Sequence, residues 1–399
     1  MVRPFDLNLR HLRSLSAIAA RGSMNAAAEA VNLSQPALTQ GLAKLERQLG
    51  VALFNRRSDG VAPTEAGALM AERADAAFSY LAAAMPRRGA RTFARSEHLM
   101  TASQAHAFLA LADAGSFVAA AEATGVSQPA LHRAARDLEM ICGVALAERR
   151  GRGVILTAAG RRLARGIRLA ASEIAAGIAD LSGEAESGLV SIGSMPLSRA
   201  LIVPYAIAGF VGGAPRAVVD VTEGSWRELV DPLRDGIIDI MVGALRDETP
   251  HGLDQRALFT DRLVVIGRAG HPLATITDPT LEDLGRFGWI VGHAGTPLRA
   301  HWDALFEGRD KPEALIECGS VMVIRGVLGD SDLLTLLSPD QVALEIESGL
   351  LTAIGPPLTQ AVRTIGITTR TGWRPTAAQR RFIALVEKAV VETRIPKSQ

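Results

Sequence analysis

Two short stretches of this chain carry the side chains with the clearest chemical purpose. Each begins with Ser-Gln-Pro-Ala-Leu, at residues 34–38 and again 93 positions later at 127–131. Apolar residues follow at steps of three or four, which predicts a helix with one buried stripe and one free face. Amide, hydroxyl and cationic groups on such a face can contact base edges and phosphates in a DNA major groove. The first free face carries Gln35, Thr39, Gln40 and Lys44, and the second carries Gln128, His132, Arg133 and Arg136.

The residues around each stretch predict one module that occurs twice. Residues 22–67 and 115–160 are identical at roughly half their positions, and the identities are spread over the whole unit. In each copy a Gly-Ser pair precedes an Ala-rich helix, and a short turn leads to a serine that can cap the next helix. That helix holds a proline in its first turn. Two helices joined by a tight turn predict a helix-turn-helix, with Ser34 and Pro36 in one copy and Ser127 and Pro129 in the other.

A basic hairpin follows each of these helices. The segments Arg-Arg-Ser-Asp-Gly at 56–60 and Arg-Arg-Gly-Arg-Gly at 149–153 predict wings that contact phosphates. A solvated turn is the alternative for an isolated arginine pair, but recurrence at the same offset favours a wing. The predicted phosphate contacts are Arg56, Arg57, Arg149, Arg150 and Arg152. A threonine then caps a long helix in each copy, over residues 66–85 and 158–181.

The length of the chain and the distribution of its charges predict domains with different functions. A chain of 399 residues suits two or three domains. Its formal net charge is +1, but residues 1–182 hold 22 Lys+Arg and 15 Asp+Glu, a balance of +7 that leaves −6 for the remainder. The basic part contains both helix-turn-helix signals, as expected for a part that binds phosphates.

The first residues of the chain and its cysteine content indicate the cellular compartment that we expect for the protein. The first six residues have no apolar leader, and no later run is long and uncharged enough for a membrane span, so we expect a cytoplasmic protein. Only Cys142 and Cys318 are present. Small core residues in a reducing compartment are the favoured interpretation, with a redox-sensing pair as the alternative.

From Gly188 onward the pattern changes to short β-branched runs alternating with amphipathic segments, which predicts an α/β fold. The expected strands cover residues 189–193, 217–221 and 238–242. Residues 194–198 are expected to open one helix, and Ser225 to cap another.

The string Gly-Ser, Ala-Ala, Ser-Gln-Pro-Ala-Leu, Leu-Glu, Gly-Val-x-Leu, Arg, Thr-x-x-Gly resembles the N-terminal domain of bacterial LysR-type transcriptional regulators. The resemblance implies a winged helix-turn-helix, a dimerising linker helix and a two-lobed effector domain of the type 2 periplasmic-binding-protein class. Two departures stand out. A family member normally has one DNA-binding module, and Ala147 replaces the expected Phe54 in the second copy.

The predicted fold is therefore α then α/β, with tandem winged helix-turn-helix modules followed by the effector domain. The expected domains are a first module at 1–86, a linker at 87–101, a second module at 102–183 and the effector domain at 188–399. Lobe I would cover about 188–262 and 363–399, and lobe II about 263–362, with crossovers near Arg262 and Arg363.

Candidate effector contacts lie where helix starts expose unpaired N–H groups and where strands end. A plain helix cap is the alternative for each serine or threonine. The segment Gly-Thr-Pro-Leu-Arg at 295–299 resembles a LysR subgroup with members that respond to sugars and others that respond to aromatic acids. The candidates are Ser194, Pro196, Leu197, Ser198, Gly224, Ser225, Gly243, Thr296, Pro297, Ser320 and Val321.

Enzymatic function is not expected. The second half offers no nucleophile with a base, no paired carboxylates and no glycine-rich phosphate loop, and its histidines lack metal-ligand spacing. We therefore predict no cofactor and no metal. The rival hypothesis is a solute-binding or enzymatic domain whose N-terminal modules serve only protein assembly. The wing arginines and the free helix faces argue against it.

The expected partners are double-stranded promoter DNA and a small-molecule effector, a sugar or an aromatic or organic acid, with self-association through linker helices and effector domains. Because one chain owns two modules and two linker helices, it could form the dimer-like pair alone. The 17 steps from Met85 to Ala102 can reach about 55 Å. Since the free faces differ, the two half-sites on DNA should differ as well. The alternative is that only the first copy contacts DNA, in an ordinary homodimer.

Overall fold

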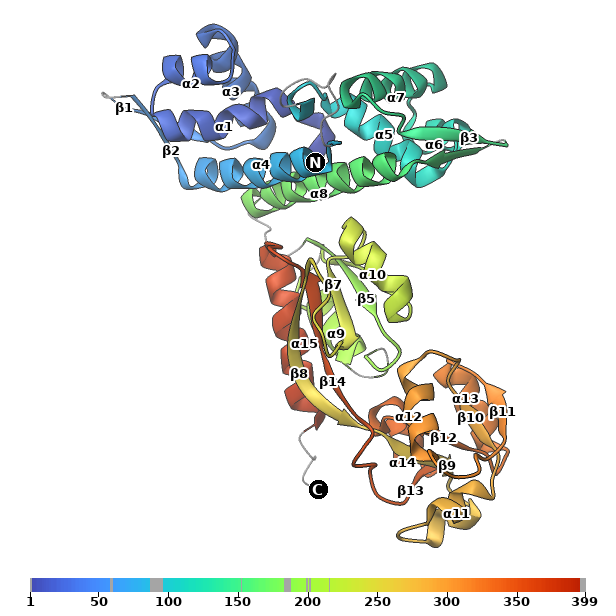
Figure 1. The fold of residues 1–399 in the computed structure, drawn as a ribbon. Coiled ribbons are helices and arrows are strands. Elements are labelled where there is room, and N and C mark those ends of the chain that lie inside the picture. Colours follow the sequence, from blue (N-terminus) through green and yellow to red (C-terminus); the bar gives the residue numbers. More distant parts are fainter. Residues whose placement is uncertain are drawn as a thin grey trace. The chain divides into compact units, whose positions relative to one another are not determined.

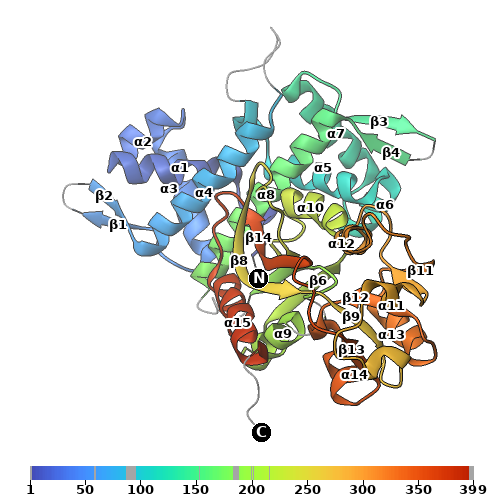
Figure 2. The same cartoon turned by 60° about the horizontal axis from the view of Figure 1, so that its bottom comes forward.

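The computed structural model describes residues 2–57, 60–86, 96–151, 153–182, 188–198, 200, 202–214 and 216–394. It contains two compact units (Figures 1 and 2). Unit 1 is Met1–Gly188 with the short segments Asp235–Ile237 and Pro375–Ala377, and unit 2 is the rest. Among the described residues no single helix is long and apolar enough to cross a membrane. Helices α5 (Ala102–Ala114) and α6 (Phe117–Thr124) pass that test of length and composition only when taken together, across a bend of 119°.

The first half of unit 1, here called module 1 (residues 2–86), is a bundle of helices with a two-stranded hairpin. The hairpin strands pair antiparallel, with Phe54 opposite Pro63. Its elements are η1 (Pro4–Asp6), α1 (Leu9–Arg21), α2 (Met24–Ala30), α3 (Gln35–Leu49), β1 (Phe54–Arg57), β2 (Gly60–Pro63) and α4 (Glu65–Ala84).

Helix α3 forms where the sequence predicts it. The Ser34 hydroxyl accepts a hydrogen bond from the Ala37 N–H, Pro36 lies in the first turn, and Gly50 ends the helix in the left-handed conformation at φ 74°. The stripe of Leu38, Leu42 and Leu45 is buried against the other helices of the module, as predicted.

The second half of unit 1, here called module 2 (residues 96–182), repeats this order of elements. The predicted cap at Ser127 is wrong in one respect. Ser127 occupies the N-cap position, but its side chain makes no cap hydrogen bond, and only its carbonyl accepts from the Ala130 and Leu131 N–H groups. The elements are η2 (Ser96–His98), α5 (Ala102–Ala114), α6 (Phe117–Thr124), α7 (Gln128–Cys142), β3 (Ala147–Arg150), β4 (Gly153–Leu156) and α8 (Ala158–Leu181).

The same side chains hold the hairpin to the helices in both modules. In module 1 the Glu46 carboxylate accepts from the N–H groups of Leu53 and Phe54, at 2.8 and 3.3 Å. In module 2 the Glu139 carboxylate accepts from Leu146 and Ala147, at 2.9 and 3.3 Å. A glutamate in each module therefore satisfies two backbone donors that neither the helix nor the hairpin pairs.

The long helices α4 and α8 both begin at a threonine N-cap. The Thr64 hydroxyl caps α4 by accepting from the Gly67 N–H at 3.0 Å, and Thr157 caps α8 by accepting from Gly160 at the same distance. A Cβ at Gly67 would collide with the Leu53 carbonyl, and a Cβ at Gly160 would collide with the equivalent Leu146 carbonyl. Only glycine permits this close approach of helix and hairpin.

Unit 2 contains two five-stranded sheets. The first has the order β6-β5-β7-β14-β8, with β5, β6 and β7 parallel and β14 antiparallel to both of its neighbours. Its core joins the inner faces of the strands to α9 and α15 around Phe210 and Phe382. Its elements are β5 (Leu189–Ser194), α9 (Ile202–Gly212), β6 (Val218–Glu223), α10 (Trp226–Asp235), β7 (Ile240–Ala244), β8 (Leu253–Arg262), β14 (Val362–Arg370) and α15 (Ala377–Arg394).

The second sheet has the order β11-β10-β12-β9-β13, with a core around Trp289, Trp302 and Phe306. The chain enters it between β8 and β9 and leaves it between β13 and β14. Its elements are β9 (Val264–Arg268), η3 (Pro272–Thr275), α11 (Leu281–Gly285), β10 (Trp289–Val291), α12 (Pro297–Leu305), β11 (Ala314–Glu317), α13 (Val321–Gly329), β12 (Leu334–Leu337), η4 (Pro339–Val342), α14 (Ala343–Glu347) and β13 (Leu351–Ile354).

The expected helix at residues 194–198 is wrong. Ser194 ends β5, the next residues form a turn, and α9 begins only at Ile202. The Ser198 hydroxyl is buried and donates to the carbonyl of Met195 or Val242, at 2.9 and 2.8 Å. The polar segment is therefore anchored to β7 and does not expose a helix start.

Candidate nucleic acid interface and effector site

The outer face of α3 carries the polar residues that the sequence places there. Gln35, Gln40 and Lys44 are exposed, and Thr39 is half-buried. The Gln35 amide donates to the Thr39 hydroxyl at 3.1 Å, which orders the first turn. This face can offer amide, hydroxyl and ammonium groups to base edges and phosphates.

The outer face of α7 is less free than predicted. Gln128, Arg133 and Arg136 are exposed, but His132 stacks on Phe117 of α6 with ring centroids 3.6 Å apart. Burial, followed by the charges of Arg149 and Arg136, lowers the pKa of His132. His132 is therefore half-buried against the scaffold and is not an open polar group.

The position equivalent to Lys44 of module 1 is Asp137 in module 2. The Asp137 carboxylate accepts a hydrogen bond from the Gln104 amide of α5 at 3.2 Å. Module 1 thus presents a lysine where module 2 has a carboxylate that contacts its own scaffold. The open groups of module 2 are mainly guanidinium groups.

The wings hold exposed arginines on β1 and β3. Arg56 lies opposite Val61, and Arg149 lies opposite Val154 in the equivalent register. Arg57 and Arg150 follow them and are also exposed. None of these four arginines forms an ion pair with a described residue, so their charges are open to phosphates. Arg152, and the linker arginines Arg87, Arg88 and Arg91, lie outside the described residues.

In unit 2, the predicted effector residues of the first sheet lie at the carboxyl ends of its strands. The Gly224 N–H donates to the Ser194 carbonyl at 3.4 Å, and a Cβ at Gly243 would press on the Met195 side chain. Ser225 occupies the position before α10, and its N–H donates to Glu228 at 2.7 Å. The structure therefore brings the predicted residues of this sheet together: Ser194, Pro196, Leu197, Ser198, Gly224, Ser225 and Gly243.

In the second sheet, two predicted residues cap helices. The Thr296 hydroxyl accepts from the Arg299 N–H at 3.4 Å and donates to the His293 carbonyl at 2.7 Å, so α12 begins at Pro297 as predicted. Ser320 caps α13, which begins at Val321. A Cβ at Gly319 would lie 3.9 Å from the His293 ring, so these two helix starts are neighbours.

Two arginines at this edge were not predicted from the sequence. The guanidinium of Arg227, in the first turn of α10, lies 3.6 Å from where a Cβ at Gly295 would stand, so it spans from the first sheet to the second. Burial and the charge of Arg227 lower the pKa of Arg246, whose guanidinium lies over the Trp226 ring at 4.8 Å. Neither arginine forms an ion pair among the described residues. No recurring motif marks them, because they meet only in the folded chain.

The two crossing strands meet at a buried carboxylate that was also not predicted. Asp261 of β8 is 2% exposed. It accepts from the Ser338 hydroxyl after β12 and from the Arg363 guanidinium of β14, both at 2.7 Å. One carboxylate thus joins the two strands that connect the sheets, β8 and β14, to the residue that follows β12 of the second sheet.

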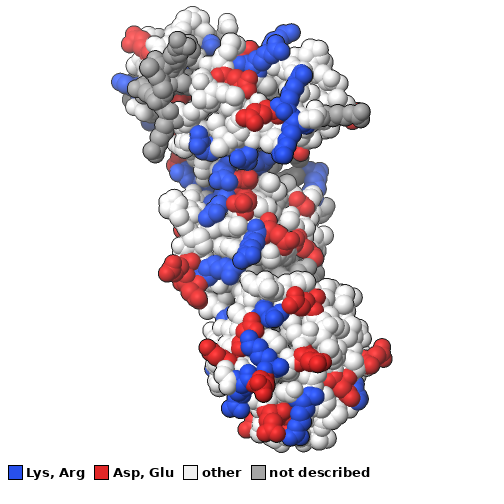
Figure 3. Space-filling view, turned by 45° about the vertical axis from the view of Figure 1, so that its right-hand side comes forward, with Lys and Arg blue, Asp and Glu red and all other residues white. Residues whose placement is uncertain are grey.

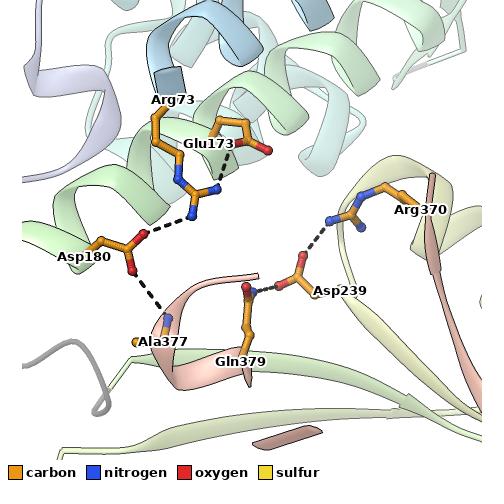
Figure 4. A network of polar contacts seen from close by, with 7 residues as sticks. All are labelled: Arg73, Glu173, Asp180, Asp239, Arg370, Ala377 and Gln379. Atoms are coloured by element: carbon orange, nitrogen blue, oxygen red, sulfur yellow. Dashed lines mark hydrogen bonds and ion pairs between the residues drawn. The ribbon is translucent and has the colours of Figure 1, made fainter. Parts of the chain in front are cut away.

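A second ion pair secures the first sheet to its helices. Arg370 donates to the carbonyls of Leu233 and Ile238 and to the Asp239 carboxylate, whose other oxygen accepts from the Gln379 amide (Figure 4). No group of three or more His, Cys, Asp or Glu among the described residues could hold a metal ion, and both cysteines are free thiols.

Acidic and basic side chains are interspersed over the face of unit 2 shown in Figure 3. No single sign of charge dominates that face. A surface of this kind does not attract a polyanion, in contrast to the exposed, unpaired arginines of the two wings.

Two winged helix-turn-helix folds in one unit and a two-sheet effector-type fold in the other define the class of protein as a ligand-responsive DNA-binding regulator. Comparison with known families agrees. The model of the bacterial regulatory helix-turn-helix protein, lysR family, matches residues 9–68 and again 102–161, and the LysR substrate binding domain matches residues 183–390. The chain belongs to the LysR family of DNA-binding transcriptional regulators.

Similar proteins fall into two groups by length. The HTH-type transcriptional regulator GalR of Pseudomonas putida is 32% identical over 395 residues, covering 96% of this chain and 98% of that protein. The SDS degradation transcriptional activation protein of a Pseudomonas species is 32% identical over 300 residues, covering 71% of this chain and 94% of its own. The first relative therefore matches this chain nearly end to end, and the second lacks a part of it.

Solved structures share the fold. A full-length variant of OxyR from Pseudomonas aeruginosa has a TM-score of 0.55 at 22% identity, covering 73% of this chain and 94% of that one. LysG from Corynebacterium glutamicum, with bound effector Arg, has a TM-score of 0.54 at 20% identity, covering 72% and 97%.

Proposed function

We propose that this chain uses both of its winged modules to bind DNA, so that one chain contacts two non-identical half-sites. Module 1 would contact bases through Gln35, Thr39, Gln40 and Lys44. Module 2 would contact them mainly through Gln128, Arg133 and Arg136. The wing arginines of both modules would contact phosphates and set the register on the duplex. Effector binding in unit 2 would modulate this activity.

One observation carries the proposal. Each module keeps the framework bonds made by the glutamate, Glu46 or Glu139, and by the threonine cap, Thr64 or Thr157. Each also leaves exposed arginines on its wing. A module retained only for packing would have no need for a wing with open charges. The P. putida relative, which aligns over almost the whole chain, supports a double arrangement outside this protein.

An electrophoretic shift with DNA from upstream of the chain's own gene tests DNA binding. Because neutralised phosphates release counterions, we expect affinity to fall steeply between 50 and 200 mM salt, by roughly 10³-fold if six or more phosphates are contacted. A chain without a salt-dependent shift would support the rival hypothesis, in which the modules serve only assembly. Glu282→Gln, an exposed change on α11 of unit 2, should leave binding unchanged.

For the effector, we propose an organic acid held at the edge where Arg227 and Arg246 meet the start of α12. Two guanidinium groups without a carboxylate partner among the described residues favour an anion over a neutral sugar. Trp226, stacked with Arg246, offers an apolar surface beside the charge. The backbone N–H groups at the starts of α12 and α13 would add hydrogen bonds to it. Thr296, Ser320 and Gly243 would shape the site.

Thermal unfolding with a panel of aromatic acids and matched neutral sugars tests this assignment. An acid at 100 times its dissociation constant should add about 2.7 kcal/mol to stability. Arg227→Gln should abolish the stabilisation by the acid and leave DNA affinity unchanged. Thr296→Val should reduce the stabilisation by the acid. Stabilisation by sugars alone, or by acids equally in Arg227→Gln, would contradict the assignment.

We further propose the domain limits expected from the sequence: modules at 1–86 and 102–183 joined by a linker at 87–101, and an effector domain at 188–399. In that domain the crossover residues lie beside Asp261, which ties Arg363 to Ser338.

A further inference from the structure

Helices α4 and α8 run antiparallel in close contact within unit 1 (Figure 1). A Cβ at Gly166 of α8 would collide with Ala84 and approach the carbonyl of Tyr80 on α4. A Cβ at Gly177, further along α8, would approach Met70 and Arg73 on α4. The small residues of α8 therefore let the two helices lie closer than ordinary side chains would permit.

These contacts come in equivalent pairs. Counting 93 positions between modules, Arg73 corresponds to Gly166, and Ala84 corresponds to Gly177. Exchanging the two modules by this offset turns the contact of Ala84 with Gly166 into the contact of Gly177 with Arg73, here called its mate. Both contacts are present. The two helices therefore meet about a pseudo-two-fold axis, as two identical helices would in a homodimer.

The charged side chains between α4 and α8 do not follow this symmetry. Arg73 is 6% exposed and forms ion pairs with Glu173 at 3.0 Å and Asp180 at 2.9 Å (Figure 4). The mate of the Arg73–Glu173 contact places Gly166 against the backbone of Tyr80, because Tyr80 corresponds to Glu173. Among the described residues the mate of this ion pair therefore carries no charge, while Arg87, the residue equivalent to Asp180, lies outside the described residues.

The same equivalences show which residues would meet if α4 paired with α4, or α8 with α8, of a second chain. If α4 paired with α4 of a second chain, Arg73 would face Tyr80 and have no carboxylate. If α8 paired with α8, Glu173 would face Gly166, which has no cationic side chain. A buried charge without its partner is strongly unfavourable, whereas a paired one is tolerated. Of these three pairings, only that of α4 with α8 places Arg73 against both Glu173 and Asp180.

We propose that Arg73, Glu173 and Asp180 select α8 as the partner of α4, so that one chain pairs its own two modules in place of a homodimer through α4. The proposal rests on the proposed use of both modules for DNA binding. Attachment within one chain adds to the selection, because it holds α8 at a high effective concentration near α4. The cluster resembles a buried polar pair that specifies the partner and register of a coiled coil.

Photo-crosslinking in the full-length chain tests the pairing. Met70 contacts α8 at Gly177, so a diazirine-bearing amino acid of similar size at Met70 would insert into its partner helix on illumination. Denaturing electrophoresis separates products with the mass of one chain from products of two chains. Peptide mass spectrometry identifies the helix that was joined. In the otherwise unaltered chain we expect a product of one-chain mass joined to the peptide that contains Gly177.

Three variants separate charge pairing from simple loss of folding. Arg73→Glu places a third carboxylate beside Glu173 and Asp180, and should lower the yield of the one-chain product at least tenfold. Adding Glu173→Arg and Asp180→Asn reverses the pair. The new asparagine side chain can still accept from the Ala377 N–H, as Asp180 does. This triple variant should recover the product to within twofold. Arg162→Glu, the same charge change on an exposed residue of α8, is the matched control and should have no effect.

Two results would overturn the proposal: Arg73→Glu with an unchanged yield, or a triple variant that fails to recover it. A two-chain product from the unaltered chain would also overturn it, whether joined to α4 or to α8 of a second copy. The DNA shift is measured on the same samples. A normal crosslink with no salt-dependent DNA binding would refute the proposed function and leave the pairing standing.

Discussion

Modules 1 and 2 place the same glutamate and threonine hydrogen bonds at equivalent positions, yet only Ser34 caps its helix through its side chain, and α3 and α7 present different side chains. Glu46 and Glu139 each bind two backbone N–H groups of the hairpin, with distances that agree within 0.1 Å. On the outer faces, Gln40 corresponds to Arg133, and Lys44 corresponds to Asp137. The framework has been kept while the exposed chemistry has changed.

The difference has a physical cause. A buried N–H without a partner costs a large part of a module's stability, so the groups that satisfy it cannot change independently. An exposed side chain makes no such bond, and its replacement changes stability little. Sequence divergence between the modules should therefore alter DNA recognition before it alters the fold. Four experiments test this comparison, from the largest expected effect to the smallest.

Gly67→Ala and Gly160→Ala should each destabilise their own module by about 3 kcal/mol or more, because the new Cβ meets a hairpin carbonyl that cannot move freely. Urea unfolding followed by hydrogen exchange of α4 and α8 measures the effect in each module. Gly326→Ala on α13, where a Cβ would meet nothing within 4 Å, is the control and should stabilise by up to about 1 kcal/mol, because alanine favours a helix over glycine. A large effect in one module and none in the other would show that the frameworks are not equivalent.

Gln40→Ala and Arg133→Ala should each remove about 1–3 kcal/mol of sequence discrimination, in one half-site only. The reason is that these residues occupy equivalent exposed positions on α3 and α7 but offer different groups to a base. Footprinting on mutated half-sites measures the effect. A symmetric palindrome that is indifferent to Arg133→Ala would mean that module 1 alone contacts bases.

Arg56→Ala and Arg149→Ala should weaken binding to all sequences alike and reduce the salt slope by about one for each phosphate that is no longer neutralised. The two variants should have similar effects, since both arginines occupy the same register of a hairpin. Titrations at several salt concentrations, with specific and random DNA, measure them. If either variant changed sequence preference and left the salt slope intact, the wing assignment would be wrong for that module.

His11→Gln should reduce the acid sensitivity of module 1 by a small amount. Burial, with the charges of Lys44 and Arg10, lowers the pKa of His11 below its ordinary value of 6.5. The unfolded chain therefore binds a proton more readily, and stability contributed by neutral His11 is lost as pH falls below about 6.5. Gln104 is the equivalent residue in module 2.

The measurement is the unfolding free energy of the full chain between pH 7.5 and 5. The variant should show a flatter decline than the unaltered protein. His251→Gln, an exposed change in unit 2, is the control. An identical pH dependence with and without His11 would exclude this histidine as a source of acid sensitivity.

The sequence determined much of this protein because its signals are local or repeated. The Ser34 cap, the stripe of Leu38, Leu42 and Leu45, and the glycine end at Gly50 define α3 from residues within one helix. The 93-residue repeat then fixes a second module by comparison, and the end points of α8 agree with the predicted 158–181.

The tertiary structure decided what depends on residues far apart in the chain. His132 fits the pattern of a free face, but Phe117 of another helix covers it. Ser194 and Ser198 fit the pattern of a helix start, but Ser194 ends β5, and a contact with β7 holds Ser198 in a turn. Arg73 meets Glu173 100 residues later, Asp261 meets Arg363 after 102, and Arg227 approaches Gly295. Spacing along the chain cannot reveal such pairs, because the distance between them is set only when helices and sheets pack.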